Sequence, residues 1–173
     1  MTMTERPTLL WSAILGLTAI VGSYGFACVF PFAAIAALAA VTLDTKRAAM
    51  LVAAVWAANQ IVGFTLMNYP LDAQAFAWSG FILMAAMAAL GAAVFVGSRE
   101  LLSILTLGAV AASIAAYQAV MFVGAYALNG FESSTATIVA QVALNDCIWF
   151  AGLSAVRLIL TRSAPRLFAP ATA

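Results

Sequence analysis

Charge is scarce in this chain. Only 8% of the 173 residues are charged and 66% are hydrophobic, whereas about a quarter of the residues in a soluble domain are charged. A chain of this composition cannot cover a water-facing surface, so we predict an integral membrane protein. The apolar runs between charges and prolines are roughly 18–25 residues long, which favours membrane helices over a barrel.

Histidine is absent and cysteine is rare. The lack of His removes the commonest transition-metal ligand and the commonest proton shuttle near neutral pH, which argues against a metal transporter or a haem protein. Cys28 and Cys147 lie in different apolar segments and form no CxxC pattern, so we expect neither a disulfide framework nor a metal site.

Other features of catalytic and nucleotide-binding proteins are also missing. The sequence has no glycine-rich phosphate loop, no paired acid and base, and no nucleophile with a recognisable activator. We therefore expect no enzyme and no bound cofactor. No basic arm is present, so we expect no nucleic acid partner.

The apolar segments predict an all-α, polytopic membrane protein, a bundle of six transmembrane helices in a single domain over residues 1–173. The predicted spans are 9–26, 27–43, 48–67, 76–96, 101–128 and 136–160. The second apolar run proper is only Phe30–Leu43, which is short for a span of about 20 residues. It must either borrow Ala27–Val29 or begin below the membrane surface at Pro31.

The basic residues predict the orientation. With six spans and a cytoplasmic N-terminus, every Lys and Arg falls on the inside: Arg6, Lys46, Arg47, Arg99, Arg157, Arg162 and Arg166. The outer loops hold only the acidic Asp72 and Glu132 as charged residues. This is the positive-inside pattern, so we predict both termini in the cytoplasm and the bacterial inner membrane as the location.

Amide side chains inside the apolar segments are the main functional candidates. Trp56, Asn59, Gln60, Gly63 and Met67 form one stripe along the third helix, and Gln141, Asn145, Trp149 and Gly152 form one along the sixth. The fifth helix adds Tyr117 and Gln118 at a similar height. These amides either bond helices to one another, typically for about 0.6 kcal/mol each, or line a pocket.

Asp146 is the sharpest candidate. A carboxylate at the centre of a membrane helix costs about 2.5–3.5 kcal/mol on insertion scales and usually marks a cavity or an internal partner. Arg157 follows eleven residues later, about 16 Å along a straight helix, which is too far for an ion pair. The partner of Asp146 must therefore be an amide, a hydroxyl, water or a ligand.

Aromatic residues crowd the predicted outer loops, which read SYGFACVFPF, NYPLDAQAFAW and NGFESSTAT. Aromatic belts occur at every membrane interface. The alternative is an external mouth in which aromatic faces stack on a flat ligand. The complete set of predicted substrate-binding residues is Tyr24, Phe30, Trp56, Asn59, Gln60, Tyr69, Trp78, Gln118, Glu132, Gln141, Asn145 and Asp146.

With six spans, these three outer loops and no ATPase of its own, the chain resembles the substrate-binding S component of energy-coupling factor (ECF) vitamin transporters. The resemblance implies that the outer loops close over a vitamin, and that the partners are a transmembrane coupling subunit and ATPases. It implies an alanine motif, AxxxA, in the first helix, where this chain has Ser12-x-x-x-Gly16. A corrinoid is one candidate substrate, with Cys28 as a ligand for its cobalt.

Two other classes of function stay open. One is a self-sufficient transporter or channel that couples to protons or cations through Asp146. The other is a structural or assembly protein of the membrane, in which the amides only bond helices together and small-residue pairs such as Ala33/Ala37 and Ala85/Ala89 allow close packing.

Overall fold

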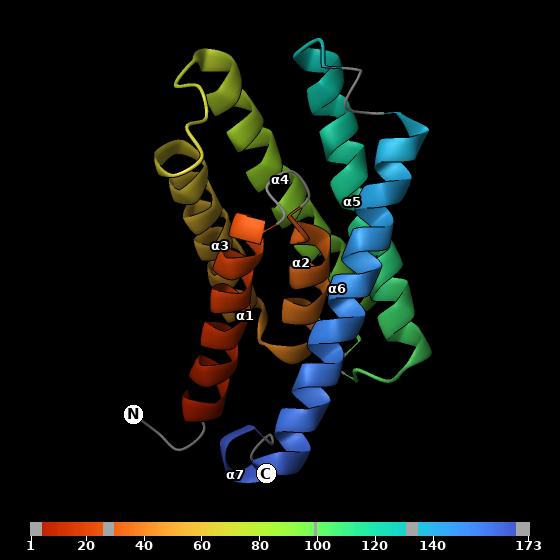
Figure 1. Ribbon diagram of the computed structural model, residues 1–173. Coiled ribbons are helices and arrows are strands. Elements are labelled where there is room, and N and C mark those ends of the chain that lie inside the picture. The colour runs from red at the N-terminus through yellow and green to blue at the C-terminus, as the bar shows by residue number, and fades with distance from the viewer. Residues whose placement is uncertain (1–4, 26–29, 99, 131–134, 169–173) are drawn as a thin grey trace.

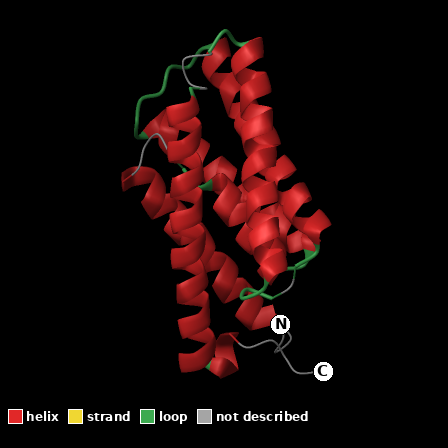
Figure 2. Cartoon of the chain, turned by 90° about the vertical axis from the view of Figure 1, so that its right-hand side faces the viewer, coloured by secondary structure: helices red, strands yellow, loops and turns green. Residues whose placement is uncertain are grey.

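The computed structural model describes residues 5–25, 30–98, 100–130 and 135–168, and this part of the chain contains helices and no strands (Figures 1 and 2). The helices are α1 Glu5–Gly25, α2 Phe32–Thr42, α3 Thr45–Thr65, α4 Ala73–Val96, α5 Ile104–Ala127, α6 Ala136–Ser163 and the single turn α7 Pro165–Phe168. The predicted all-α fold and the order of its six principal helices are confirmed. The sequence did not predict α7.

Four of these helices, α3 to α6, are long and apolar enough to cross a membrane. A multi-pass membrane protein follows from them. Helix α1 has 21 residues and contains a shorter apolar stretch, Thr8–Thr18. Helix α2 has only 11 residues and therefore rises about 16 Å, roughly half the thickness of the hydrocarbon core.

The short second helix begins directly after Pro31, which occupies its N-cap position. The sequence left two alternatives for the second apolar run: a helix that includes Ala27–Val29, or a shorter helix that begins at Pro31. The structure shows the shorter helix. A span over residues 27–43 is longer than the helix that forms, and residues 27–29 lie outside the described residues.

Side chains of the chain's own loops cap the four long helices. The N-cap residues Asp44, Asp72, Ser103 and Thr135 each accept a hydrogen bond from the backbone N–H three residues further on, which satisfies one of the N–H groups that a first turn leaves free. Helix α2 has no such cap, because Pro31 offers no side-chain acceptor.

The start of α1 and the single turn α7 lie at one end of the bundle, which we call the termini end (Figure 1). The α2–α3 and α4–α5 connections lie at the same end. The α3–α4 connection, the last turn of α5 and the first turn of α6 lie at the opposite end, which we call the loop end (Figure 1). Helix α2 starts well below the loop end and runs toward the termini end, so the upper part of the bundle is framed mainly by α3, α4, α5 and α6.

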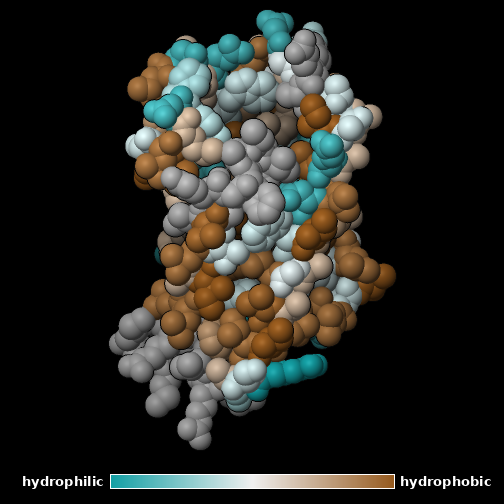
Figure 3. Space-filling model, viewed as in Figure 1, coloured by the Kyte–Doolittle hydropathy of each residue, from teal (hydrophilic) through white to brown (hydrophobic). Residues whose placement is uncertain are grey.

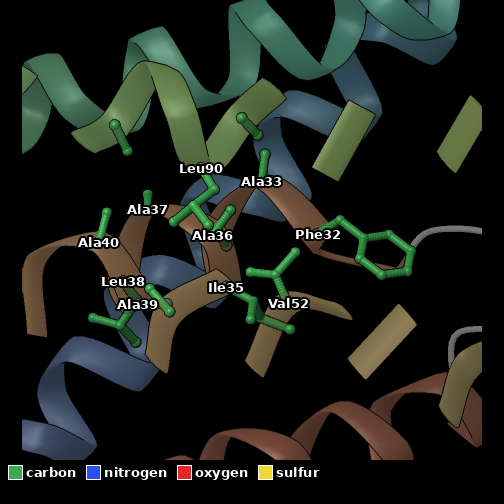
Figure 4. Packing of buried hydrophobic residues seen from close by; sticks show 14 of the residues in the cluster. Phe32, Ala33, Ile35, Ala36, Ala37, Leu38, Ala39, Ala40, Val52 and Leu90 are labelled. Atoms are coloured by element: carbon green, nitrogen blue, oxygen red, sulfur yellow. The ribbon is translucent and has the colours of Figure 1, made fainter. Parts of the chain in front are cut away.

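Helix α2 is the centre of the hydrophobic core. All residues from Phe32 to Val41 are buried, and α2 packs against α3, α4, α5 and α6. Val52 of α3 and Leu90 of α4 reach it from different sides (Figure 4). Six of the buried residues of α2 are alanines, whose small side chains let the surrounding helices approach closely.

The surface matches this arrangement. Large apolar side chains point outward, with Phe95 of α4 92% exposed and Leu107 of α5 64% exposed, as expected for faces that meet lipid. Figure 3 shows hydrophobic residues over the middle and lower part of the molecule, hydrophilic residues at the loop end, and a hollow between the tips of the helices at that end.

Candidate functional site

The carboxylate of Asp146 reaches the first turn of α2. Asp146 is only 1% exposed, and its Oδ1 accepts a hydrogen bond of 2.9 Å from the backbone N–H of Ala34. Ala34 is the third residue of α2, so its N–H has no partner within the helix. Asp146 of α6 therefore supplies the N-cap that α2 lacks, 112 residues away in sequence.

This contact identifies the hydrogen-bond partner of the Asp146 carboxylate within the protein. The partner is a backbone amide, and the charge of the carboxylate also faces the positive end of the α2 dipole, where an anion is stabilised. No Lys or Arg is needed to hold the carboxylate in the bundle. The core side of α6 is made by Asp146, Phe150, Leu153 and Ser154.

Helix α5 holds the same turn of α2 from another side. Ser113, fully buried, donates a hydrogen bond of 2.9 Å from Oγ to the carbonyl oxygen of Ala33. One turn further along α5, the ring of Tyr117 stacks on Phe32 with 6.3 Å between centroids and 16° between planes. The ring of Phe30 lies 4.4 Å from that of Phe32. The start of α2 is thus fixed by both neighbouring helices.

The predicted amides do not all join this cluster. On α3, the indole N–H of Trp56 donates to the carbonyl oxygen of Ser79 at 2.9 Å, which ties α3 to α4. Asn59 and Asn145 are half-buried, and each makes an interaction within the protein. Gln141 is exposed on α6, whereas Trp149 of the same predicted stripe packs against the hydrophobic core.

Two glutamines keep an unsatisfied amide nitrogen. The Nε2 atoms of Gln60 on α3 and Gln118 on α5 are buried and have no hydrogen-bond partner among the described residues. A buried donor without a hydrogen-bond partner lowers the stability of the folded protein by about 1–3 kcal/mol. These two side chains are therefore the amides best placed to bond to a molecule from outside the chain.

The aromatic residues of the loop end fall into two groups. Phe64 stacks on Phe76 at 5.1 Å and meets the edge of Tyr69 at 6.2 Å, around the α3–α4 connection. Trp78 packs at the α4–α5 side, where a Cβ added to Gly130 would lie 2.7 Å from the Cζ2 atom of its ring. The glycine is thus what lets the backbone pass the indole.

Three of the predicted residues lack a described side chain. Tyr24 belongs to the last turn of α1, but its side chain lies outside the described part of the structure. Glu132 and the proposed cobalt ligand Cys28 lie outside the described residues altogether. Among the described residues no group of three or more Cys, Asp or Glu side chains is placed to hold a metal ion.

A second contact set holds the other end of α2. The guanidinium of Arg157 lies over the ring of Trp11 of α1, 4.8 Å from its centroid. The indole N–H of Trp11 donates to Oγ1 of Thr42, the last residue of α2, at 2.9 Å. The half-buried Arg157 therefore packs against an aromatic ring of α1.

The spacing of the two charges on α6 matches the length of α2. Asp146 and Arg157 are eleven residues apart on α6, and α2 is 11 residues long. Since both helices rise about 1.5 Å per residue, the negative charge meets the positive end of α2 and the positive charge lies near its negative end. Both charges therefore stabilise the same helix dipole.

Comparisons of the chain with protein-family models, with curated proteins and with solved structures find no match.

Proposed function

We propose that this chain is a membrane-embedded substrate-binding subunit for uptake of a vitamin or a similar small molecule, energised by partner ATPase subunits, as its resemblance to ECF S components implies. All six principal helices belong to the membrane domain, both termini are cytoplasmic, and the membrane is the bacterial inner membrane. The observation that carries the proposal is the half-length helix α2, whose first turn is capped by Asp146 inside the bundle.

A helix that starts inside a bundle leaves the region beyond its start to loops, side chains or a ligand. In membrane transporters, substrate sites are commonly built at the ends of such discontinuous helices. Here the region beyond α2 is framed by the loop-end parts of α3 to α6 (Figure 1). The ring of Phe30 packs on that of Phe32 at the start of α2, and Gln60 of α3 has a buried amide nitrogen without a hydrogen-bond partner among the described residues.

The charge distribution supports the orientation and limits the substrate class. The first turn of α3, which carries Lys46 and Arg47, and the last turn of α6, which carries Arg162, lie at the termini end (Figure 1). A cytoplasmic termini end agrees with the positive-inside pattern. The loop end contributes no Lys or Arg, so a flat or heterocyclic, mostly uncharged ligand suits it better than a phosphate. A corrinoid remains one candidate.

Equilibrium binding tests this proposal. The purified chain, in detergent, is titrated with a panel of water-soluble vitamins that includes riboflavin, biotin, thiamine and cobalamin. We expect one of them to bind at nanomolar concentration. We also expect Trp78→Ala to weaken that binding without unfolding the protein, whereas Phe95→Ala, on the lipid-facing side of α4, leaves it unchanged. A panel without a binder would refute the proposal.

The burial of Asp146 favours a second candidate function, a self-sufficient transporter coupled to protons or cations. An ionisable group inside a membrane bundle is the usual coupling group of such proteins. In this case, uptake into vesicles that contain only this chain depends on the pH gradient, and Asp146→Asn abolishes that dependence. If uptake instead requires an added ATPase partner, the result supports the substrate-binding subunit.

A further inference from the structure

A groove of about 490 Å³ runs between α5 and α6. Its lining residues are Leu107, Val110, Ala111, Ile114, Ala115, Gln118, Val139, Ala143 and Cys147. The α5 residues recur every three or four positions and so form one face of that helix. Three alanines in the lining keep the groove open, because a larger side chain at any of them would fill it.

Exposed apolar side chains that face the bilayer border the groove. Leu107 in its lining is 64% exposed, and Leu144 and Ile148 on the neighbouring face of α6 are each 62% exposed. These are the lipid-facing sides of two helices that are long enough to cross the membrane. A molecule would therefore reach the groove sideways, from within the membrane.

Gln118 is the one amide in this apolar lining, and its Nε2 is buried without a hydrogen-bond partner among the described residues. A hydrocarbon chain in the groove leaves this donor unsatisfied, at a cost of about 1–3 kcal/mol. A molecule that carries a carbonyl or ether oxygen on an apolar body would remove this cost once the amide turns toward it.

We propose that the α5–α6 groove is a binding site for a lipophilic molecule that enters from the bilayer and presents an oxygen acceptor to Gln118. The volume lies within the range of about 300–1,000 Å³ that is usual for small-molecule sites. The proposal does not rest on vitamin binding at the loop end, because the groove has its own opening and needs no residue of the loops.

Cys147 provides the test, since its exposed thiol lies in the groove. In a Cys28→Ser chain it is the sole thiol, and its rate of reaction with N-ethylmaleimide in detergent reports whether the groove is filled. The probes are decylubiquinone, whose fully substituted ring does not add thiols, and decylbenzene, which has the same tail and no acceptor. We expect decylubiquinone to slow the reaction about tenfold, as one hydrogen bond allows, and decylbenzene to slow it far less.

Two variants make the test specific. Gln118→Leu should remove the advantage of decylubiquinone over decylbenzene, whereas Gln60→Leu, which removes the other unsatisfied amide, should retain it. Ala115→Leu fills the groove and keeps the amide, so it should abolish protection by either probe, and it decides the question if Gln118→Leu does not fold. Equal protection by both probes, or none by either, would overturn the proposal.

Discussion

Replacement of Asp146 separates its role as a cap from its role as a charge. In Asp146→Leu the side chain keeps a similar size, but the N–H of Ala34 loses its acceptor inside the bundle. Leaving that donor unsatisfied costs about 1–3 kcal/mol, and loss of the interaction with the α2 dipole adds up to about 2 kcal/mol. We expect a total loss of about 3 kcal/mol in the free energy of unfolding.

A compensating effect works in the opposite direction. Leu is preferred over Asp in hydrocarbon, and replacing both members of a buried polar pair by apolar groups is often neutral. Here only one member can be replaced, because the other is backbone. The unsatisfied N–H therefore remains in the folded protein, and the net effect is destabilising.

Asp146→Asn refines the measurement. The amide oxygen can still accept from Ala34, so only the charge is lost and we expect a loss of about 1–2 kcal/mol. The assay is denaturation in mixed micelles, followed by circular dichroism. Asp72→Asn serves as the control, because Asp72 is an exposed N-cap of α4, where loss of the charge removes only a few tenths of a kcal/mol to 1 kcal/mol. If Asp146→Leu is as stable as the wild type, the cap does not stabilise α2.

The remaining predictions use the same assay. Ser113→Ala removes the hydrogen bond to Ala33 and should cost about 1 kcal/mol; an unchanged midpoint would show that α5 does not hold α2 through this bond. Gly124→Ala places a Cβ 2.9 Å from Cγ of Phe81, whereas Gly152→Ala meets nothing within 4 Å, so the first should be less stable than the second by about 2 kcal/mol. Equal stabilities would contradict close packing of α4 on α5. Arg157→Met removes the contact with Trp11 and should cost about 1 kcal/mol, with Arg157→Lys recovering part of it; if Arg157→Met costs nothing, the charge does not support α2.

The fold was largely predictable from the sequence because hydrophobic length is a property of each segment alone. Runs of apolar residues, bounded by charges and prolines, predicted six helices in the right order. The position of Pro31 also predicted a short second helix, as one of two alternatives. The helix caps at Asp44 and Asp72 follow from local spacing in the same way.

The site was only partly predictable, because its contacts join distant segments through backbone groups. The sequence identified Asp146 as a residue that needs a partner, but every residue carries an N–H, so nothing distinguished Ala34. Ser113 was missed because a serine in a helix usually bonds a carbonyl of its own preceding turn. Its spacing of four from Tyr117 was the available signal. The amide stripe of α6 did not show which of its members face the core, because the rotation of a helix depends on its neighbours: Trp149 packs against the core and Gln141 is exposed.

The proposed function rests on a ligand bound between the start of α2 and the loop end of the bundle. The most direct measurement is calorimetric titration of the vitamin panel into the purified wild-type chain and into Asp146→Asn. The account predicts nanomolar binding of one vitamin to the wild type and weaker binding to the variant, since the start of α2 is then less firmly held. Failure of every vitamin to bind the folded wild-type chain would contradict it.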